Sequence, residues 1–311
     1  MRPMGLFEAR MLQTIATRRY MEPGSPRTKR YLLASDFDQT LSFNDSGQVL
    51  SDLIGATGYR EKVEGLAAAN LVQQGGELAY LIRHDPAFRG VRREHLVEAG
   101  RRARLKQGIP ALLDFLASGV DGFSFAFYVI SAAPREMVES ALHGLVPPEN
   151  IFGTDFDFDA ESGEVRAIRR VAAGYGKVAV LEELEARLGV EPDHAIYVGD
   201  GSSDVHVMLH VNNRGGFTIA ASENPYLASI AKRTVLSESV MSFLVPVLDD
   251  IVGWRAADIQ ALLDRHQLTL RGWEKPRTDR IVPVRFAPLG APIMIAASVA
   301  AAAMGRSAGL G

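Results

Sequence analysis

The sequence contains no cysteine among its 311 residues. Disulfide bonds, thiolate metal sites and a cysteine nucleophile are therefore excluded, and we expect a cytoplasmic protein, since the cytosol is where disulfides are rare. The chain also lacks a strong charge of either sign, because its formal net charge is −3. This balance predicts no nucleic acid and no anionic membrane as the main partner.

Long apolar runs are also absent. Residues 293–304 are apolar and rich in alanine, but about a dozen residues is too short to span a bilayer. We predict no transmembrane segment and expect this tail to form a helix that packs on the domain or on a partner. Residues 1–29 lack the apolar centre of a secretory signal. They predict a short helix over 6–20 and a linker over 21–30.

The composition that remains is that of an ordinary globular protein, with 47% hydrophobic and 23% charged residues. Strand-like and helix-like segments alternate along much of the chain, which predicts an α/β fold with a parallel sheet. The predicted strands are 31–35, 123–130, 151–158, 164–168, 194–198, 217–220 and 234–236, and the predicted helices are 109–116, 135–145, 177–188, 205–211, 225–231, 240–254 and 256–266. Parallel sheets of this kind place their sites at the carboxyl ends of the strands.

One segment breaks the alternation. Between about 44 and 107 there is no strand-like run, and apolar residues recur at helical spacing in three stripes. We therefore predict an all-helical insertion after the first strand. A run of basic residues near its end, from Arg89 to Lys106, favours a solvated helix face for most of its members, although some could face a site and hold an anionic group.

The first strand ends in two carboxylates, Asp36 and Asp38, followed by the hydroxyl of Thr40. Alternation along an extended chain would direct both carboxylates to the same side. Two such acids repel each other unless a cation lies between them. The pattern predicts either a metal site or a paired acid/base site.

Later strands end in polar residues as well. Ser131 follows the strand at 123–130, Asp200 and Asp204 follow the strand at 194–198, and Lys177 begins a helix just before that strand. In a parallel sheet all of these groups would lie at one edge. Carboxylates, a hydroxyl and an ammonium group are what phosphoryl transfer requires, and Mg²⁺ prefers carboxylate oxygens. We therefore expect Mg²⁺ as the cofactor.

These motifs, in this order, resemble those of the haloacid dehalogenase superfamily of phosphohydrolases. Asp-Phe-Asp-Gln-Thr at 36–40 resembles the first motif, Ser131 the second, Lys177 the third and Gly-Asp-Gly-Ser-Ser-Asp at 199–204 the fourth. The resemblance covers about residues 30–236 and is greatest to the phosphoserine-phosphatase-like branch. It implies a Rossmann-like three-layer core with a parallel sheet, and a helical cap inserted after the first strand.

The resemblance also implies a role for each matched residue. Asp36 would be the nucleophile and a magnesium ligand, and Asp38 would protonate the leaving group, activate water and bind the metal through its backbone carbonyl. Thr40, Ser131 and Lys177 would serve the phosphate site, where Thr40 supports the loop and Lys177 also holds the nucleophile. The predicted metal ligands are Asp36, Asp38, Asp200 and Asp204, with Asp204 as a ligand or as a support.

Together these features predict a Mg²⁺-dependent phosphatase that hydrolyses a small phosphorylated metabolite through an aspartyl-phosphate. A phosphotransferase that uses the same intermediate is one alternative, and a binding or scaffold protein that keeps the fold is another. The predicted domains are an N-terminal extension (1–29), a core (30–43 and 108–236), the cap (44–107) and a C-terminal extension (237–311). The last of these could also mediate a homo-oligomer.

Three positions depart from the phosphoserine phosphatase pattern. Ser203 stands where asparagine is frequent, and Ala132 and Ala133 follow Ser131 where glycines are usual. The cap also lacks a good match to the segment that holds the serine moiety, so phosphoserine is not the expected substrate. His206 and His210 have a spacing that can bind zinc, but no third ligand is evident, and we interpret the pair as a coincidence of the helix face.

Overall fold

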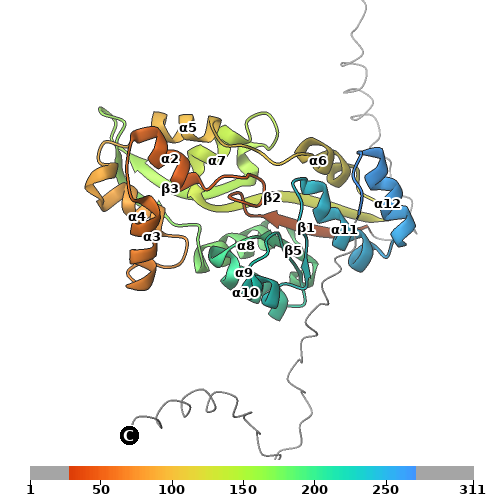
Figure 1. The fold of residues 1–311 in the computed structure, drawn as a ribbon. Coiled ribbons are helices and arrows are strands. Elements are labelled where there is room, and N and C mark those ends of the chain that lie inside the picture. Colours follow the sequence, from red (N-terminus) through yellow and green to blue (C-terminus); the bar gives the residue numbers. More distant parts are fainter. Residues whose placement is uncertain (1–27, 271–311) are drawn as a thin grey trace, which may run out of the picture. The chain divides into compact units, whose positions relative to one another are not determined.

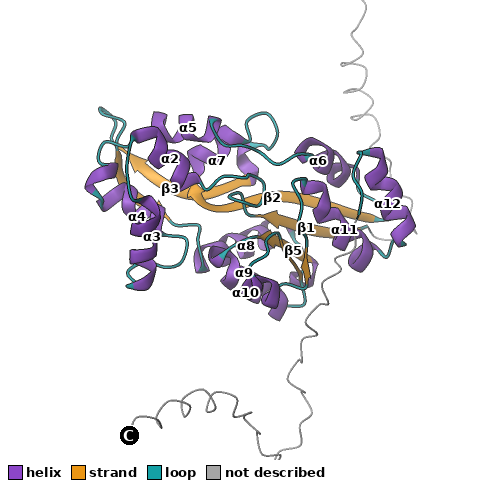
Figure 2. Cartoon of the chain, viewed as in Figure 1, coloured by secondary structure: helices purple, strands orange, loops and turns teal. Residues whose placement is uncertain are grey.

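The structure is a computed structural model that describes residues 28–270. Its centre is a seven-stranded sheet with the strand order β4-β3-β2-β1-β5-β6-β7, parallel except where β3 and β4 form an antiparallel hairpin (Figures 1 and 2). The strands are β1 (Lys29–Ser35), β2 (Phe123–Pro134), β3 (Ile151–Phe158), β4 (Val165–Arg170), β5 (Ala195–Gly199), β6 (Phe217–Ala220) and β7 (Arg233–Thr234). The predicted α/β class is confirmed.

Helices cover both faces of the sheet. They are α6 (Ile109–Ser118), α7 (Arg135–Ala141), α8 (Tyr175–Leu188), α9 (Val205–Asn213), α10 (Pro225–Ile230), α11 (Leu244–Pro246) and α12 (Ala256–Arg265). Figure 1 shows α8, α9 and α10 on one side of the sheet and α6, α11 and α12 on the other. The result is the expected three-layer core.

Strand β1 lies in the middle of the sheet and is apolar on both faces. Leu32 packs in the cluster under α8 and α9, while its neighbour Leu33 packs in the cluster under α6. Both side chains are fully buried. A continuous apolar run of this kind is typical of a parallel strand covered on both sides. The residues that follow β1, such as Asp36, are therefore buried at the carboxyl edge of the sheet.

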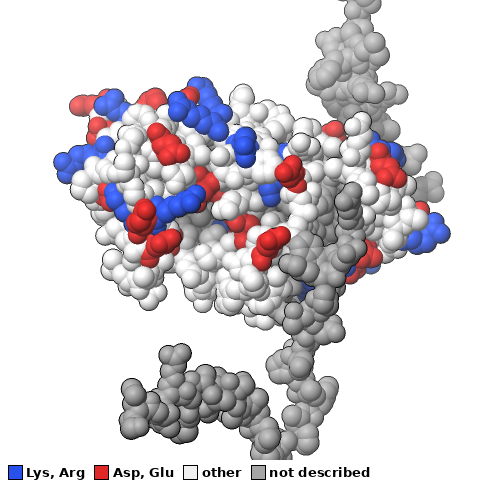
Figure 3. Space-filling model, viewed as in Figure 1, with Lys and Arg blue, Asp and Glu red and all other residues white. Residues whose placement is uncertain are grey.

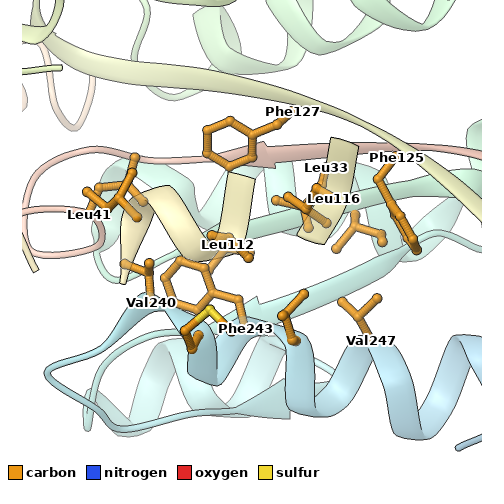
Figure 4. Packing of buried hydrophobic residues seen from close by; sticks show 14 of the residues in the cluster. Leu33, Leu41, Leu112, Leu116, Phe125, Phe127, Val240, Phe243 and Val247 are labelled. Atoms are coloured by element: carbon orange, nitrogen blue, oxygen red, sulfur yellow. The ribbon is translucent and has the colours of Figure 1, made fainter. Parts of the chain in front are cut away.

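Residues beyond 236 contribute to the core. Val240, Phe243 and Val247 pack against Leu112 of α6 and Phe127 of β2 (Figure 4). This segment is not the single helix predicted over 240–254. It begins as a 3-10 turn, Val240–Phe243, passes through α11 and ends in a π-helical turn, Val247–Val252. The apolar spacing is helical on average, but the hydrogen-bond register changes along it.

The helical insertion after β1 is present, with α2 (Ser46–Ile54), α3 (Tyr59–Ala68), α4 (Glu77–His84) and α5 (Arg93–Arg101). Its apolar side chains form a cluster of their own, which also includes Phe156 of β3 and Met137 of α7. Helix α5 lies close to α7, where a Cβ at Gly100 would overlap the Met137 carbonyl oxygen. The insertion is therefore packed along β3, β4 and α7.

The two chain crossings between the core and the insertion are hydrogen-bonded to each other. The Phe43 amide donates to the Arg104 carbonyl over 2.8 Å, and the Lys106 amide donates to the Leu41 carbonyl over 2.8 Å. Ser42 and Leu105 form the antiparallel bridge between them. We call residues 41–43 and 104–106 the paired crossings. They begin one residue after Thr40.

Apart from the segment after residue 240, β2 and α7 differ most in length from the prediction. Strand β2 continues past Ile130 to Pro134, because it pairs again with β3 beyond a bulge and the Thr154 hydroxyl donates to the Ala132 carbonyl over 2.7 Å. Helix α7 ends at Ala141 rather than at residue 145, and Leu142 caps it.

The predicted helix 6–20 and the apolar tail 293–304 lie outside the described residues, and the domain boundaries remain a prediction. Within residues 28–270, no helix is long and apolar enough to cross a membrane.

Candidate active site

Three carboxylates meet at the carboxyl edge of the sheet. Strands β1 and β5 are parallel neighbours, and the Asp36 amide donates to the Val198 carbonyl over 2.8 Å just beyond the last paired residues. Asp36, Asp200 and Asp204 each direct an oxygen into this space, and these atoms all lie within 4.8 Å of one another. In residues 28–270 they are the one group of side chains placed to hold a metal ion.

Lys177 lies between two of these acids. Its Nζ is 2.9 Å from Asp36 Oδ1 and 2.6 Å from Asp204 Oδ1, and the lysine side chain is fully buried. Burial alone would lower the pKa of Lys177, but the carboxylates of Asp204 and Asp36 outweigh it and raise the pKa above its usual value. The lysine is therefore a permanent cation that fixes the orientation of Asp36.

The Asp204 carboxylate is fully engaged by the protein. Its Oδ1 also accepts from the Tyr197 hydroxyl over 2.7 Å, and its Oδ2 accepts from the amides of Asp200 and Gly201, each over 3.1 Å. These contacts hold the loop after β5 in place and leave Asp36 and Asp200 as the less engaged carboxylates. Tyr197 was not predicted as a site residue, because a tyrosine within a buried strand is indistinguishable from a core residue in sequence.

Negative charge at this edge exceeds what the lysine neutralises. Burial, followed by repulsion from Asp204, raises the pKa of Asp36 to about 6 and that of Asp200 to about 8. Thr40 lies beside Asp200, since its hydroxyl donates to Asp200 Oδ1 over 3.3 Å. Desolvated carboxylates with too few cations fit a hard divalent ion such as Mg²⁺. The donor set is thus suited to the predicted cofactor.

Asp38 is held by the insertion. The hydroxyl of Ser46, the first residue of α2, donates to Asp38 Oδ1 over 2.6 Å. Burial is the largest cause, and the Asp45 carboxylate the next, of a rise in the pKa of Asp38 to about 8. A carboxyl group with this pKa is protonated at neutral pH and can therefore donate a proton.

Ser131 lies beside the two aspartates of the first motif. In the register of β1 and β2, Ser35 is opposite Val129, so Ser131 comes level with the loop that follows β1. It is buried, and its hydroxyl oxygen accepts from the Ala133 amide over 3.2 Å. The elongated β2 therefore delivers this hydroxyl to the same edge as Asp36.

The insertion contacts the core directly above this edge through Gly75. A Cβ at this glycine would lie 2.7 Å from Ser203 Cβ, 2.9 Å from Ala173 Cβ and 3.4 Å from Ala132 Cβ, and its φ of +88° disfavours any side chain. Two of these neighbours, Ser203 and Ala132, are departures noted in the sequence. The contact covers the segments that bear Ser131, Lys177 and Asp204.

Other sequence candidates are not part of this group. The ring of His206 is tilted against the ring of Tyr175, with 4.3 Å between the ring centroids, and His210 lies against Arg214. Basic and acidic side chains are interspersed over the face of the insertion seen in Figure 3. Lys106 differs from the rest of the basic run because it is half-buried. Burial lowers its pKa, and the charge of Asp200 partly opposes this change.

The model of one protein family, described as haloacid dehalogenase-like hydrolase, matches residues 33–209. The chain belongs to this family. No curated protein matches the sequence. The matched span includes Asp36, Ser131, Lys177 and Asp204, and so contains every predicted motif. The family predicted from sequence is confirmed, and with it an enzyme of the hydrolase class.

Solved structures of this family have the same fold. A phosphoserine phosphatase in its apo form is 20% identical, with a TM-score of 0.54, and the match covers 70% of this chain and 98% of that one. A family hydrolase from Salmonella enterica serovar Typhi is 15% identical, with a TM-score of 0.53 and coverages of 75% and 77%. A probable phosphoserine phosphatase from Vibrio cholerae is 17% identical, with a TM-score of 0.53 and coverages of 73% and 68%. These likenesses confirm the predicted fold.

Proposed function

We propose that the protein is a Mg²⁺-dependent phosphatase that hydrolyses a small phosphorylated metabolite through an aspartyl-phosphate on Asp36. The observation that carries the proposal is the buried Lys177, whose ammonium joins Asp36 and Asp204 beside Asp200. A carboxylate fixed by a lysine and accompanied by further acids is an arrangement suited to nucleophilic attack on phosphorus.

The first half of the reaction transfers the phosphoryl group. An oxygen of Asp36 bonds to phosphorus while the bond between phosphorus and the ester oxygen breaks, and the leaving oxygen takes the proton of Asp38. The raised pKa of Asp38 supplies that proton at neutral pH. Lys177 and Ser131 hold the non-bridging oxygens of the phosphoryl group, as donors fixed before the reaction begins.

The second half releases phosphate. Water attacks phosphorus and breaks its bond to Asp36, and the Asp38 carboxylate accepts the proton from that water. The side chains of Asp36 and Asp200 and the backbone carbonyl of Asp38 would hold Mg²⁺, with Asp204 supporting them through the loop. When bound, the ion neutralises negative charge on the carboxylates and on the phosphoryl group.

The insertion encloses this chemistry. Gly75 touches the core beside Ser131 and Lys177, and Ser46 holds the proton donor. A cover of this kind excludes bulk water from the phosphoryl group and sets which leaving groups are admitted. Substrate specificity is therefore a property of the insertion rather than of the sheet edge.

A generic phosphate ester, p-nitrophenyl phosphate, tests the proposal when it is supplied with Mg²⁺. We expect hydrolysis by the wild type, and a decrease on the order of 10⁴-fold for Asp36→Asn, which removes the nucleophile. Asp155→Asn is the matched control, because Asp155 lies on β3 and, among residues 28–270, forms an ion pair only with Arg135. Acid quenching during turnover, followed by mass spectrometry, should find a phosphate adduct on the peptide that contains Asp36.

Undiminished turnover by Asp36→Asn would refute the assignment of the nucleophile. Turnover that is unaffected by a chelator would refute the role of the metal. Added alcohols separate hydrolysis from transfer, since a phosphotransferase would form a new phosphoester in place of inorganic phosphate.

A further inference from the structure

Lys106 occupies a defined place beside the active site. Its amide donates to the Leu41 carbonyl within the paired crossings, and Leu41 directly follows Thr40. The Thr40 hydroxyl in turn donates to Asp200. Lys106 is thereby fixed on the side of the site where the chain returns from the insertion, whereas Lys177 approaches from helix α8.

The two lysines differ in how they are neutralised. Lys177 is fully buried between two carboxylates at 2.9 and 2.6 Å. Lys106 is half-buried, and within residues 28–270 its ammonium takes part in no hydrogen bond and no ion pair. Of the charged groups there, Asp200 is the one whose field it senses. Burial disfavours the charged form of a lysine and lowers the pKa of Lys106, so the ammonium gains if an anion comes into contact with it.

The other cations of the basic run are exposed, and most of them are engaged elsewhere. Arg104 stacks over the ring of Phe43 at 5.1 Å and is exposed, and Arg102 pairs with Glu98 at 3.0 Å. These residues follow the general expectation for a solvated face. Lys106 is the exception, because it is partly buried beside the carboxylates at the sheet edge.

We propose that Lys106 is a specificity-determining residue that binds a second anionic group of the substrate, so that the preferred substrates are phosphate monoesters that also carry a carboxylate or another acidic group. The inference rests on the proposed function, since the phosphoryl group itself is assigned to Lys177 and Ser131. Lys106 has no role in that inner site. Its free ammonium fits an anion on the part of the substrate that leaves with the alcohol.

Binding of three phosphonates by isothermal titration calorimetry, with Mg²⁺ in excess, tests the inference. Methylphosphonate has no second acidic group, whereas phosphonoacetate and 3-phosphonopropionate add a carboxylate at two different reaches. We expect the wild type to bind at least one carboxylate-bearing phosphonate about tenfold more tightly than methylphosphonate, as one charge-assisted contact provides. Lys106→Gln should lose this preference, and Lys106→Arg should retain most of it.

Arg104→Gln is the matched control, because it removes a neighbouring cation of the same crossing and should keep the preference. Lys106→Met, which retains the apolar stem, serves if Lys106→Gln does not fold, as judged by circular dichroism. Equal preference in the wild type and in the folded neutral variant would overturn the inference. It would also be overturned if the variant changed only the affinity for Mg²⁺, since Lys106 would then serve the metal site.

The titration reports binding whether or not any ester is hydrolysed. If the wild type fails to hydrolyse p-nitrophenyl phosphate but Lys106 governs the carboxylate preference, the proposed function fails and the binding role stands. If hydrolysis occurs and the preference is absent or independent of Lys106, the proposed function stands and the inference fails.

Discussion

The sheet edge and the part of the insertion around Gly75 border the same candidate site, but they are held in place by different interactions. At the sheet edge, Asp36, Lys177 and Asp204 are buried charges held by ion pairs and hydrogen bonds. At the insertion, Gly75 contacts the core closely because it has no side chain. Charged groups can be recognised in sequence by their type and order, whereas a steric contact between distant segments cannot. The charged residues that would carry out the chemistry can thus be predicted from their types, whereas the steric contact that would control access to them cannot.

The largest effect is expected when the charge network is broken. Lys177→Met would leave Asp36 and Asp204 facing each other without a cation, and we expect it to lower the free energy of unfolding by about 3 to 5 kcal/mol and to abolish turnover. Urea denaturation measures the first effect. The insertion supplies the comparison in Lys62, which pairs with Asp85 at 2.9 Å but is about one third exposed. Lys62→Met should cost about 1 kcal/mol or less.

A double variant separates the contribution of Lys177 to stability from its contribution to activity. Lys177→Met combined with Asp204→Asn removes one of the two carboxylates that repel each other, and should recover part of the lost stability without recovering activity. A double variant no more stable than Lys177→Met would indicate that packing, rather than charge, dominates at this position.

The steric contact should affect activity more than stability. Gly75→Ala places a Cβ 2.7 Å from Ser203 Cβ at a φ of +88°, so the segment above the sheet edge must shift. We expect kcat/KM for p-nitrophenyl phosphate to fall by about 10- to 100-fold. Gly65→Ala is the control within the same insertion, because nothing lies within 4 Å of its Cβ position in helix α3. It should be neutral in activity and stabilise by about 0.5 to 1 kcal/mol.

If the contact of Gly75 with the core has no effect on function, the Gly75→Ala and Gly65→Ala variants should have equal activity. Ser203→Gly in the Gly75→Ala background removes the nearest atom and should restore part of the activity, since the contact with Ala173 Cβ at 2.9 Å and the backbone strain at residue 75 then remain.

A further effect is expected on the pH dependence of stability. The pKa of Asp38 rises from 3.8 to about 8 in the folded protein, so between these values the folded state keeps a proton that the unfolded state releases. The contribution of Asp38 to stability is therefore lost as pH rises from about 4 to about 8. In a chelator, the wild type should lose stability relative to Asp38→Asn over this window, as thermal unfolding measures.

For Asp157 we expect the opposite dependence of stability on pH. Hydrogen bonds from Arg166 and Arg169 lower the pKa of this partly exposed carboxylate, so its contribution is present above its ordinary pKa and is lost as the pH falls. Matching slopes for Asp38→Asn and Asp157→Asn would contradict the environment assigned to Asp38.

Much of the fold could be predicted because apolar runs and helical stripes report burial directly. The strand before Asp36 and the helix that bears Lys177 are examples, and order along a parallel sheet then brings their polar residues together. The continuation of β2 past Ser131 could not be predicted, because it depends on pairing with β3 across a bulge and on the Thr154 hydroxyl. Likewise, Ser46 and Tyr197 gain their places from tertiary contacts with Asp38 and Asp204. The roles assigned to the motif residues remain predictions.

The paired crossings have a mechanical consequence. A lid joined to its base by two separate strands can twist about either one, but residues 41–43 and 104–106 are hydrogen-bonded into a single ribbon. Tilting this ribbon would move Ser46 relative to β1 and so change the length of its hydrogen bond to Asp38. We therefore expect an interlock, in which Asp38, the proposed proton donor, is correctly held only while the insertion is seated on the sheet.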